Sequence, residues 1–155
     1  MAKPDKDPIV ILMADDDDDD FVLTEKALKE SKLLNTLIRV RDGEELLDYL
    51  HNSGEYTGQN TTRPGVILLD LNMPRKDGRE ALREIKSDPG LRDIPVVVFT
   101  TSKAEEDIYK SYQLGVNSFI TKPVTFENLI AVMKALGKYW FEIVELPQGN
   151  GSRRS

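Results

Sequence analysis

The sequence predicts an α/β protein with a doubly wound, five-stranded parallel sheet that carries helices on both faces. The first observation behind this prediction is a set of five short apolar runs that alternate with segments of helical spacing. The second is the unbroken apolar character of Val66–Leu69, which is typical of a strand buried on both faces, as in a parallel sheet. The five predicted strands are Ile9–Ala14, Leu37–Val40, Val66–Leu69, Pro95–Phe99 and Phe119–Thr121.

Five helices are predicted to alternate with these strands. Four of them have a side chain in place to cap the helix N-terminus, and these capping residues are Asp17, Asp18, Asp42, Ser102 and Thr125. The first helix is expected to end near Glu30, the third at Asp88-Pro89-Gly90 and the fourth near Gly115. The apolar residues assigned to these helices are Phe21, Leu23, Ala27, Leu28, Leu46, Leu47, Leu50, Leu82, Ile85, Ile108, Tyr109, Tyr112, Phe126, Leu129, Ile130, Met133, Leu136 and Trp140. An inward face is expected for Leu46, Leu47 and Leu50 and for the stripe Phe126, Leu129, Ile130, Met133 and Leu136.

The bulk properties exclude several classes of protein. A chain of 155 residues is long enough for one domain with a core, and its net charge of -6 argues against direct binding to nucleic acid. It contains no cysteine, so disulfides and CxxC metal sites are excluded. The polar start shows no signal peptide, and no apolar stretch is long enough to span a membrane. We therefore expect a soluble, cytoplasmic protein with a flexible lead over 1–8, one domain over 9–141 and a partly apolar tail over 142–155 with a disordered end.

Polar residues of particular kinds stand at the carboxyl ends of four predicted strands. Asp15 and Asp16 follow the first, Asp70 the third, Thr100 the fourth and Lys122 the fifth. In a parallel sheet these ends meet at one edge, where α/β proteins bind ligands. Three carboxylates crowded together repel one another and need a cation or a proton, and an oxygen-loving ion such as Mg²⁺ suits them.

The same group of residues suits phosphoryl chemistry. A carboxylate such as Asp70 can attack phosphorus and form an acyl phosphate. Lys122 supplies a positive charge where a phosphoryl group would lie, and the Thr100 hydroxyl can donate a hydrogen bond to it. Taken alone, Asp70 could equally be a helix cap or a loop acid, and the acids after the first strand could simply cap a helix. The order of these residues on the strand ends favours the site.

At this point the chain resembles a response-regulator receiver domain of bacterial two-component signalling. The resemblance covers about Ile9 to Leu136 and implies the flavodoxin-like sheet order 2-1-3-4-5. The matching segments are Ala14-Asp15-Asp16, Leu68-Leu69-Asp70-Leu71-Asn72-Met73-Pro74 with Gly78, Phe99-Thr100, and Phe119-Ile120-Thr121-Lys122-Pro123.

The resemblance implies a role for each site residue. Asp70 would accept the phosphoryl group from a sensor histidine kinase, and Thr100 and Lys122 would contact it. Asp15, Asp16 and Asp70 would hold Mg²⁺. The backbone carbonyl of Asn72 would be a further metal ligand. Thr100 and Phe119 would together form the conformational switch. Such a protein is not an enzyme on separate substrates but promotes its own phosphorylation and dephosphorylation.

Three features resemble the small regulators that pair with bacterial phytochrome kinases. They are Asp20 in the first acidic loop, the long polar loop Gly54–Pro64 and the aromatic, apolar tail. The resemblance therefore implies a phytochrome-type histidine kinase as partner. The acids Asp17–Asp19 depart from the mixed residues of many relatives. No DNA-binding domain is expected after the last helix.

A homodimer is expected from surplus apolar surface near the C-terminus. After the inward stripe of the last helix, the chain continues with Tyr139, Trp140, Phe141, Ile143, Val144 and Leu146. Leaving such side chains in water is unfavourable, and a two-fold dimer is the commonest way to cover them. The expected interface comprises helix 4 (near 102–115), the strand Phe119–Thr121, the helix after Thr125 and the tail. The alternative is a tail that folds back on its own domain.

Other functions also fit parts of the pattern. A phosphatase of the haloacid-dehalogenase class uses a strand-end aspartate with Mg²⁺, but it needs a general acid two residues later, where Asn72 cannot deliver a proton. A pseudo-receiver that binds partners without phosphorylation is the second alternative. Flavin binding is disfavoured because no Ser/Thr/Gly-rich loop follows Ile9–Ala14. His51, the single histidine, could carry a phosphoryl group but better fits a surface position on a helix.

Overall fold

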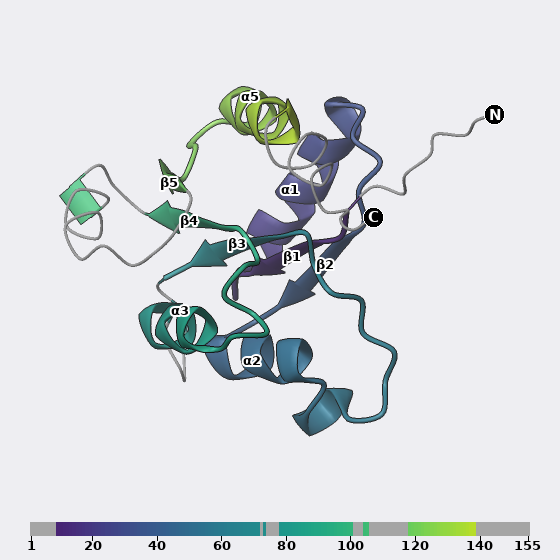
Figure 1. The fold of residues 1–155 in the computed structure, drawn as a ribbon. Helices are drawn as coiled ribbons and strands as arrows, with labels where there is room; N and C mark the ends of the chain where they lie inside the picture. Colours follow the sequence, from purple (N-terminus) through teal and green to yellow (C-terminus); the bar gives the residue numbers. More distant parts are fainter. Residues whose placement is uncertain (1–8, 72, 74–77, 101–103, 106–117, 139–155) are drawn as a thin grey trace.

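The computed structural model describes residues 9–71, 73, 78–100, 104–105 and 118–138, and it confirms the predicted sheet (Figure 1). Five parallel strands lie in the order β2-β1-β3-β4-β5. Their bounds are β1 Ile11–Ala14, β2 Leu37–Val40, β3 Val66–Asp70, β4 Val96–Thr100 and β5 Ser118–Thr121. β1 begins two residues later than predicted, β4 one residue later and β5 one residue earlier.

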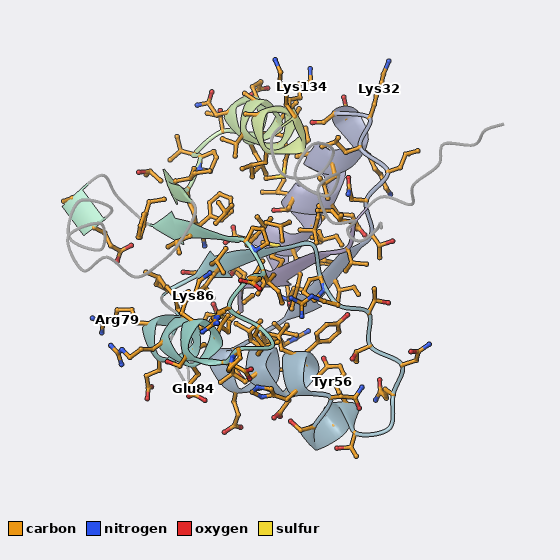
Figure 2. The ribbon with its side chains drawn as sticks, viewed as in Figure 1. Lys32, Tyr56, Arg79, Glu84, Lys86 and Lys134 are labelled. Atoms are coloured by element: carbon orange, nitrogen blue, oxygen red, sulfur yellow. The ribbon has the colours of Figure 1, made fainter. Side chains whose placement is uncertain are left out.

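The described part of the chain has four α-helices. They cover the two faces of the sheet (Figure 1). α1 (Asp18–Glu30) and α5 (Phe126–Leu136) pack on one face, and α2 (Gly43–His51) and α3 (Gly78–Ser87) pack on the other. Charged side chains on the outer sides of α3 and α5 point away from the sheet, as Arg79, Glu84 and Lys134 show in Figure 2. The helix predicted over 102–115 lies outside the described residues except for Ala104 and Glu105, which are helical.

Each face of the sheet has its own apolar core. Leu12, Ile67 and Val98 point toward α2 and α3, whereas Met13, Leu68 and Val97 point toward α1 and α5. Neighbouring strand residues therefore alternate between the two cores, as the pleat of a strand requires. All five residues of β3 are buried, because this strand lies in the middle of the sheet and has a core on either side.

The run of six acids is built differently from the expected loop. α1 begins at Asp18, so Asp18–Asp20 form its first helical turn. The predicted cap is confirmed, because the Asp17 carboxylate accepts hydrogen bonds from the backbone N–H groups of Asp19 (2.8 Å) and Asp20 (3.3 Å). Negative charge is favourable at this end of a helix, which explains how the sequence can place three acids there.

Two other predicted helix starts are confirmed. The Asp42 carboxylate accepts a hydrogen bond from the Glu45 N–H (2.8 Å), and the Thr125 hydroxyl accepts one from Asn128 (3.1 Å). The Glu45 carboxylate reaches back to the N–H of Arg41, one residue before the position of an ideal capping box.

The loop after α2 is more ordered than its polar sequence suggests. A 3₁₀ turn covers Gly54–Tyr56, and the Tyr56 hydroxyl donates to the Glu45 carboxylate (2.6 Å). The Tyr49 hydroxyl donates to the carbonyl of Thr62 (2.8 Å), and the two tyrosine rings meet edge to face.

Within the described ranges, no helix combines the length and the apolarity that a membrane span requires.

Gly78 begins α3 and touches the chain that follows β3. The structure places this glycine at the first position of the helix. A Cβ atom at Gly78 would lie 2.6 Å from the Leu71 Cα and 2.8 Å from the Asp70 carbonyl oxygen. The Gly78 N–H also donates to the Leu71 carbonyl (3.2 Å). Glycine is therefore required here by close packing of the helix against the end of the central strand.

Candidate functional site

Asp70 is the last residue of β3, and its side chain is almost fully buried at the carboxyl edge of the sheet. Residue 70 is paired with Phe99 of β4, which fixes the backbone position. A buried carboxylate needs compensating charge or hydrogen bonds. One such partner is the Lys122 ammonium, whose Nζ lies 3.1 Å from Asp70 Oδ2.

Asp15 and Asp16 follow β1 directly and approach Asp70. The Asp15 N–H extends the pairing with β2 by donating to the Val40 carbonyl (3.0 Å), and Asp15 is only 2% exposed. Asp16 is exposed. One carboxylate oxygen from each of Asp15, Asp16 and Asp70 lies within 4.8 Å of the others. An all-carboxylate set of this kind, open on one side, fits a hard divalent cation such as Mg²⁺ that keeps several water ligands.

Lys122 follows β5 and brings a positive charge to this group. Its Nζ lies 2.7 Å from Asp20 Oδ2, 3.1 Å from Asp70 Oδ2 and 3.2 Å from Asp15 Oδ2. Burial disfavours the charged ammonium, but Asp20, Asp70 and Asp15 together outweigh that effect and raise the pKa of Lys122. Lys122 is therefore a permanent cation at the carboxyl edge at neutral pH.

Burial also disfavours the charged form of Asp15, and for a carboxyl group this means a higher pKa. It raises the pKa of the Asp15 carboxyl to about 7, although the N–H of Asp17 and the charge of Lys122 favour the ionised form. The neighbouring Asp20 carboxylate contributes to this increase. One lysine therefore does not balance the crowded acids, and a divalent cation would favour the ionised state of Asp15.

The comparison with known protein families agrees with this geometry. The family model of the response regulator receiver domain matches residues 11–134. The chain belongs to the receiver family. This receiver is 44% identical to the response regulator Rcp1 of Synechocystis sp. over 147 residues, which cover 95% of this chain and 99% of Rcp1.

Solved structures of related regulators share the fold. The phosphorylated cyanobacterial phytochrome response regulator RcpA is 46% identical, with a TM-score of 0.75, over 85% of this chain and 93% of RcpA. The Mn²⁺-bound form of Rcp1 is 44% identical, with a TM-score of 0.76, over 88% of this chain and 96% of the other. The predicted resemblance to phytochrome response regulators is confirmed.

The structure brings together four of the residues that the sequence proposed for the site, namely Asp15, Asp16, Asp70 and Lys122.

The other predicted residues are described only in part. Asn72 and the side chain of Thr100 lie outside the described part. The backbone of Thr100 ends β4 and is paired with Thr121. Phe119 is partly buried against the core beneath α2 and α3. His51 ends α2 as an exposed residue and contacts Asp88 (2.9 Å), as a surface position predicts.

The contact between Asp20 and Lys122 does not follow from the sequence pattern. Asp20 is expected there only as a feature of the acidic loop, whereas the structure pairs its carboxylate with Lys122, 102 positions later in the chain. One feature of the sequence is compatible with this contact, because the first helix could begin inside the acidic run. A residue in the first turn of a helix that follows β1 can point toward the carboxyl edge of the sheet.

Arg39 is a second residue that the sequence did not single out. It lies on β2, and its guanidinium contacts the Asp18 carboxylate (2.6 Å) and the Asp15 carbonyl oxygen (3.4 Å). The same group lies 5.2 Å from the centre of the Phe21 ring, within range of a cation–π interaction. Arg39 therefore ties the start of α1, and with it the candidate metal-binding loop, to the sheet.

Proposed function

We propose that this protein is a single-domain response regulator that accepts a phosphoryl group on Asp70 from a sensor histidine kinase. The observation that carries the proposal is the position of the buried Asp70 carboxylate at the end of the central strand. Lys122 Nζ lies 3.1 Å from one oxygen of Asp70, and oxygens of Asp15 and Asp16 lie within 4.8 Å of the Asp70 carboxylate. These groups supply a nucleophile, a fixed positive charge and a set of ligands for a divalent cation.

The reaction follows from these roles. A carboxylate oxygen of Asp70 attacks phosphorus, an O–P bond forms, and the P–N bond of the kinase phosphohistidine breaks. The imidazole leaves with the electron pair of that bond and takes up a proton from water. Lys122 offers its N–H groups to a phosphoryl oxygen and so stabilises the charge that gathers there in the transition state. The Thr100 hydroxyl is proposed as a second donor to the same group.

Mg²⁺ is the proposed cofactor. Asp15, Asp16 and Asp70 would hold it, with the backbone carbonyl of Asn72 as a further ligand. When bound, the ion neutralises negative charge on the carboxylates and on the incoming phosphoryl group. The donor set supports this choice, and so does the similarity to Rcp1, whose structure has been solved in an Mn²⁺-bound form.

A bacterial phytochrome kinase is the proposed partner. The support is similarity, because the related RcpA is a cyanobacterial phytochrome response regulator whose solved structure is phosphorylated. Transfer of labelled phosphate from a purified phytochrome kinase, against a histidine kinase without a phytochrome module, tests this part. Faster labelling by the phytochrome kinase is expected, and equal labelling by both would contradict the choice of partner.

The output is proposed to pass through Thr100 and Phe119. Movement of the Thr100 hydroxyl toward the phosphoryl group would free space that the Phe119 ring can enter.

We further propose a cytoplasmic homodimer formed by helix 4, β5, α5 and the tail. Its domain would span 9–141, with 1–8 as a flexible lead and 142–155 as the tail. Light scattering on the full chain and on a chain that ends at Lys138 tests the dimer. A full-length monomer at tens of micromolar, with and without phosphorylation, would refute it.

Phosphorylation by acetyl phosphate tests the central proposal. With Mg²⁺ present, intact-protein mass spectrometry should show one added phosphate on the wild type. Asp70→Asn should abolish it, whereas the control Asp93→Asn, which removes an exposed acid from the turn before β4, should leave it unchanged. Full labelling of Asp70→Asn would contradict the assignment, and no labelling of the wild type would contradict the function.

A further inference from the structure

Lys122 shares its ammonium group among three carboxylates, and the nearest is not the proposed phosphoacceptor. The distance from Nζ to Asp20 Oδ2 is 2.7 Å, against 3.1 Å to Asp70 and 3.2 Å to Asp15. Charge-assisted N–H···O bonds typically measure about 2.7–2.9 Å, so the contact with Asp20 alone falls within the range of a strong one. In this structure Asp20 is therefore the main hydrogen-bond partner of Lys122.

The backbone around Asp20 is held by α1. The Asp20 N–H donates to the capping carboxylate of Asp17 (3.3 Å), and the Asp20 carbonyl accepts a bond from the Thr24 hydroxyl (2.7 Å). Asp20 therefore reaches Lys122 from a fixed helical turn. The lysine is placed between two elements, with α1 supplying one carboxylate and the ends of β1 and β3 supplying the other two.

This arrangement opposes the role that phosphoryl transfer gives to Lys122. A phosphoryl group on Asp70 extends beyond the carboxylate and needs the ammonium beside its oxygens. Because Lys122 makes its shortest bond with Asp20, a shift of the ammonium toward the phosphoryl oxygens would lengthen that bond and weaken it. The Asp20 side chain is 33% exposed, against 7% for Asp70, so water can solvate Asp20 once the lysine has left.

We propose that Asp20 is a positioning residue that holds the Lys122 ammonium away from its place beside the phosphoryl group and thereby slows phosphorylation of Asp70. This inference rests on the proposed function, because it assigns Asp20 a part in the same reaction. The rate of phosphorylation is then set by a competition between two anions, the Asp20 carboxylate and the phosphoryl group, for one lysine.

The expected effect is moderate, because Asp20 is partly solvated. Removing its charge should raise the rate constant for phosphorylation by acetyl phosphate about fivefold, which corresponds to about 1 kcal/mol in the barrier. Asp20→Asn keeps the shape of the side chain while removing the charge. Asp19→Asn removes the same charge from an exposed neighbour in the same helical turn, whose carboxylate is not one of the three that bind Lys122 in the described structure.

The experiment compares rate constants in Mg²⁺ for the wild type, Asp20→Asn, Asp19→Asn and Asp20→Glu. Asp20→Asn should be faster and Asp19→Asn should match the wild type. Asp20→Glu keeps the negative charge, so its rate should stay close to that of the wild type. The longer side chain has room, because Asp20 and Lys122 line a cavity of about 100 Å³. In a Lys122→Met background, Asp20→Asn should no longer accelerate the reaction.

Two kinds of failure are distinguishable. If the wild type takes up no phosphate, the proposed function fails. If the wild type is phosphorylated but Asp20→Asn is no faster than Asp19→Asn, the function stands and the role of Asp20 is overturned. An equal acceleration by both variants would show a general charge effect, and an acceleration that persists in Lys122→Met would show that Asp20 does not act through the lysine; either result overturns the inference.

Discussion

Gly78→Ala should destabilise the protein, although alanine is the better helix former. The added Cβ would lie 2.6 Å from the Leu71 Cα and 2.8 Å from the Asp70 carbonyl oxygen. Carbon atoms in contact prefer separations of about 3.5–4.0 Å, so α3 and the end of β3 must move apart by roughly 1 Å. Both obstacles are backbone atoms and cannot be relieved by a change of rotamer.

The magnitude follows from two opposed contributions. Overpacking in a tight contact destabilises a protein by about 1–3 kcal/mol. Replacing glycine by alanine in a helix restores up to about 1 kcal/mol. Both of the shortest contacts are with backbone atoms, so we take the upper part of the first range, about 2–3 kcal/mol. Subtracting about 1 kcal/mol leaves an expected net loss of about 1–2 kcal/mol in the free energy of unfolding, or roughly 2–8 °C in the melting temperature of a chain of this size.

Urea denaturation of Gly78→Ala and of a matched control measures this loss. In Gly90→Ala the new Cβ would meet a single atom, Asp88 Oδ1, at 3.4 Å, so that variant should be as stable as the wild type or slightly more stable. Because the Gly78 N–H bonds to the Leu71 carbonyl, Gly78→Ala should also slow phosphorylation by shifting the chain after Asp70. Equal urea midpoints for Gly78→Ala and Gly90→Ala would refute the reasoning.

Three further predictions test the surroundings of the site. Mg²⁺ should stabilise the wild type by about 2.7 kcal/mol at a hundredfold excess over its dissociation constant, and Asp16→Ala should lose most of that shift in a thermal melt. Arg39→Met should lower the free energy of unfolding in urea by about 1 kcal/mol, because it removes an ion pair and a cation–π contact. The Arg41 side chain is 62% exposed, so the control Arg41→Met should change the stability little. Equal effects of the two substitutions would contradict the role of Arg39. The hydrogen bond with His51 lowers the pKa of Asp88, so its contribution to stability is present above the unfolded pKa of about 3.9 and is lost as the pH falls through the lower, folded pKa. The stabilities of the wild type and Asp88→Asn should therefore differ at about pH 6 and approach each other as the pH falls through the folded pKa. A difference that stays constant over an acid titration would contradict this.

The parts of the site that lie directly after strands could be predicted from the sequence. An apolar run such as Val66–Leu69 identifies the strand, and the next residue, Asp70, must then lie at the carboxyl edge. The same reasoning places Asp15 and Lys122, because parallel strands bring their ends together whatever their separation in sequence. These predictions need element order and register but no side-chain directions.

The contacts of Asp20 and Arg39 could not be predicted in the same way. The contact of Asp20 with Lys122 depends on the residue at which α1 begins within six identical acids, which periodicity does not determine. Arg39 interrupts an otherwise apolar four-residue strand, and a cation there is as consistent with solvent exposure as with burial against α1. Both contacts arise from the packing of a helix turn against a strand end, which the hydrophobic pattern of the sequence does not determine.

Chemical trapping of the acyl phosphate tests the central claim most directly. After reaction with acetyl phosphate and Mg²⁺, borohydride reduces an aspartyl phosphate to homoserine, and tandem mass spectrometry of the peptides locates the reduced residue. We predict homoserine at position 70 and aspartate unchanged at positions 15, 16 and 20. Homoserine at one of those three positions, with Asp70 intact, would contradict the assignment of Asp70 as the phosphoacceptor.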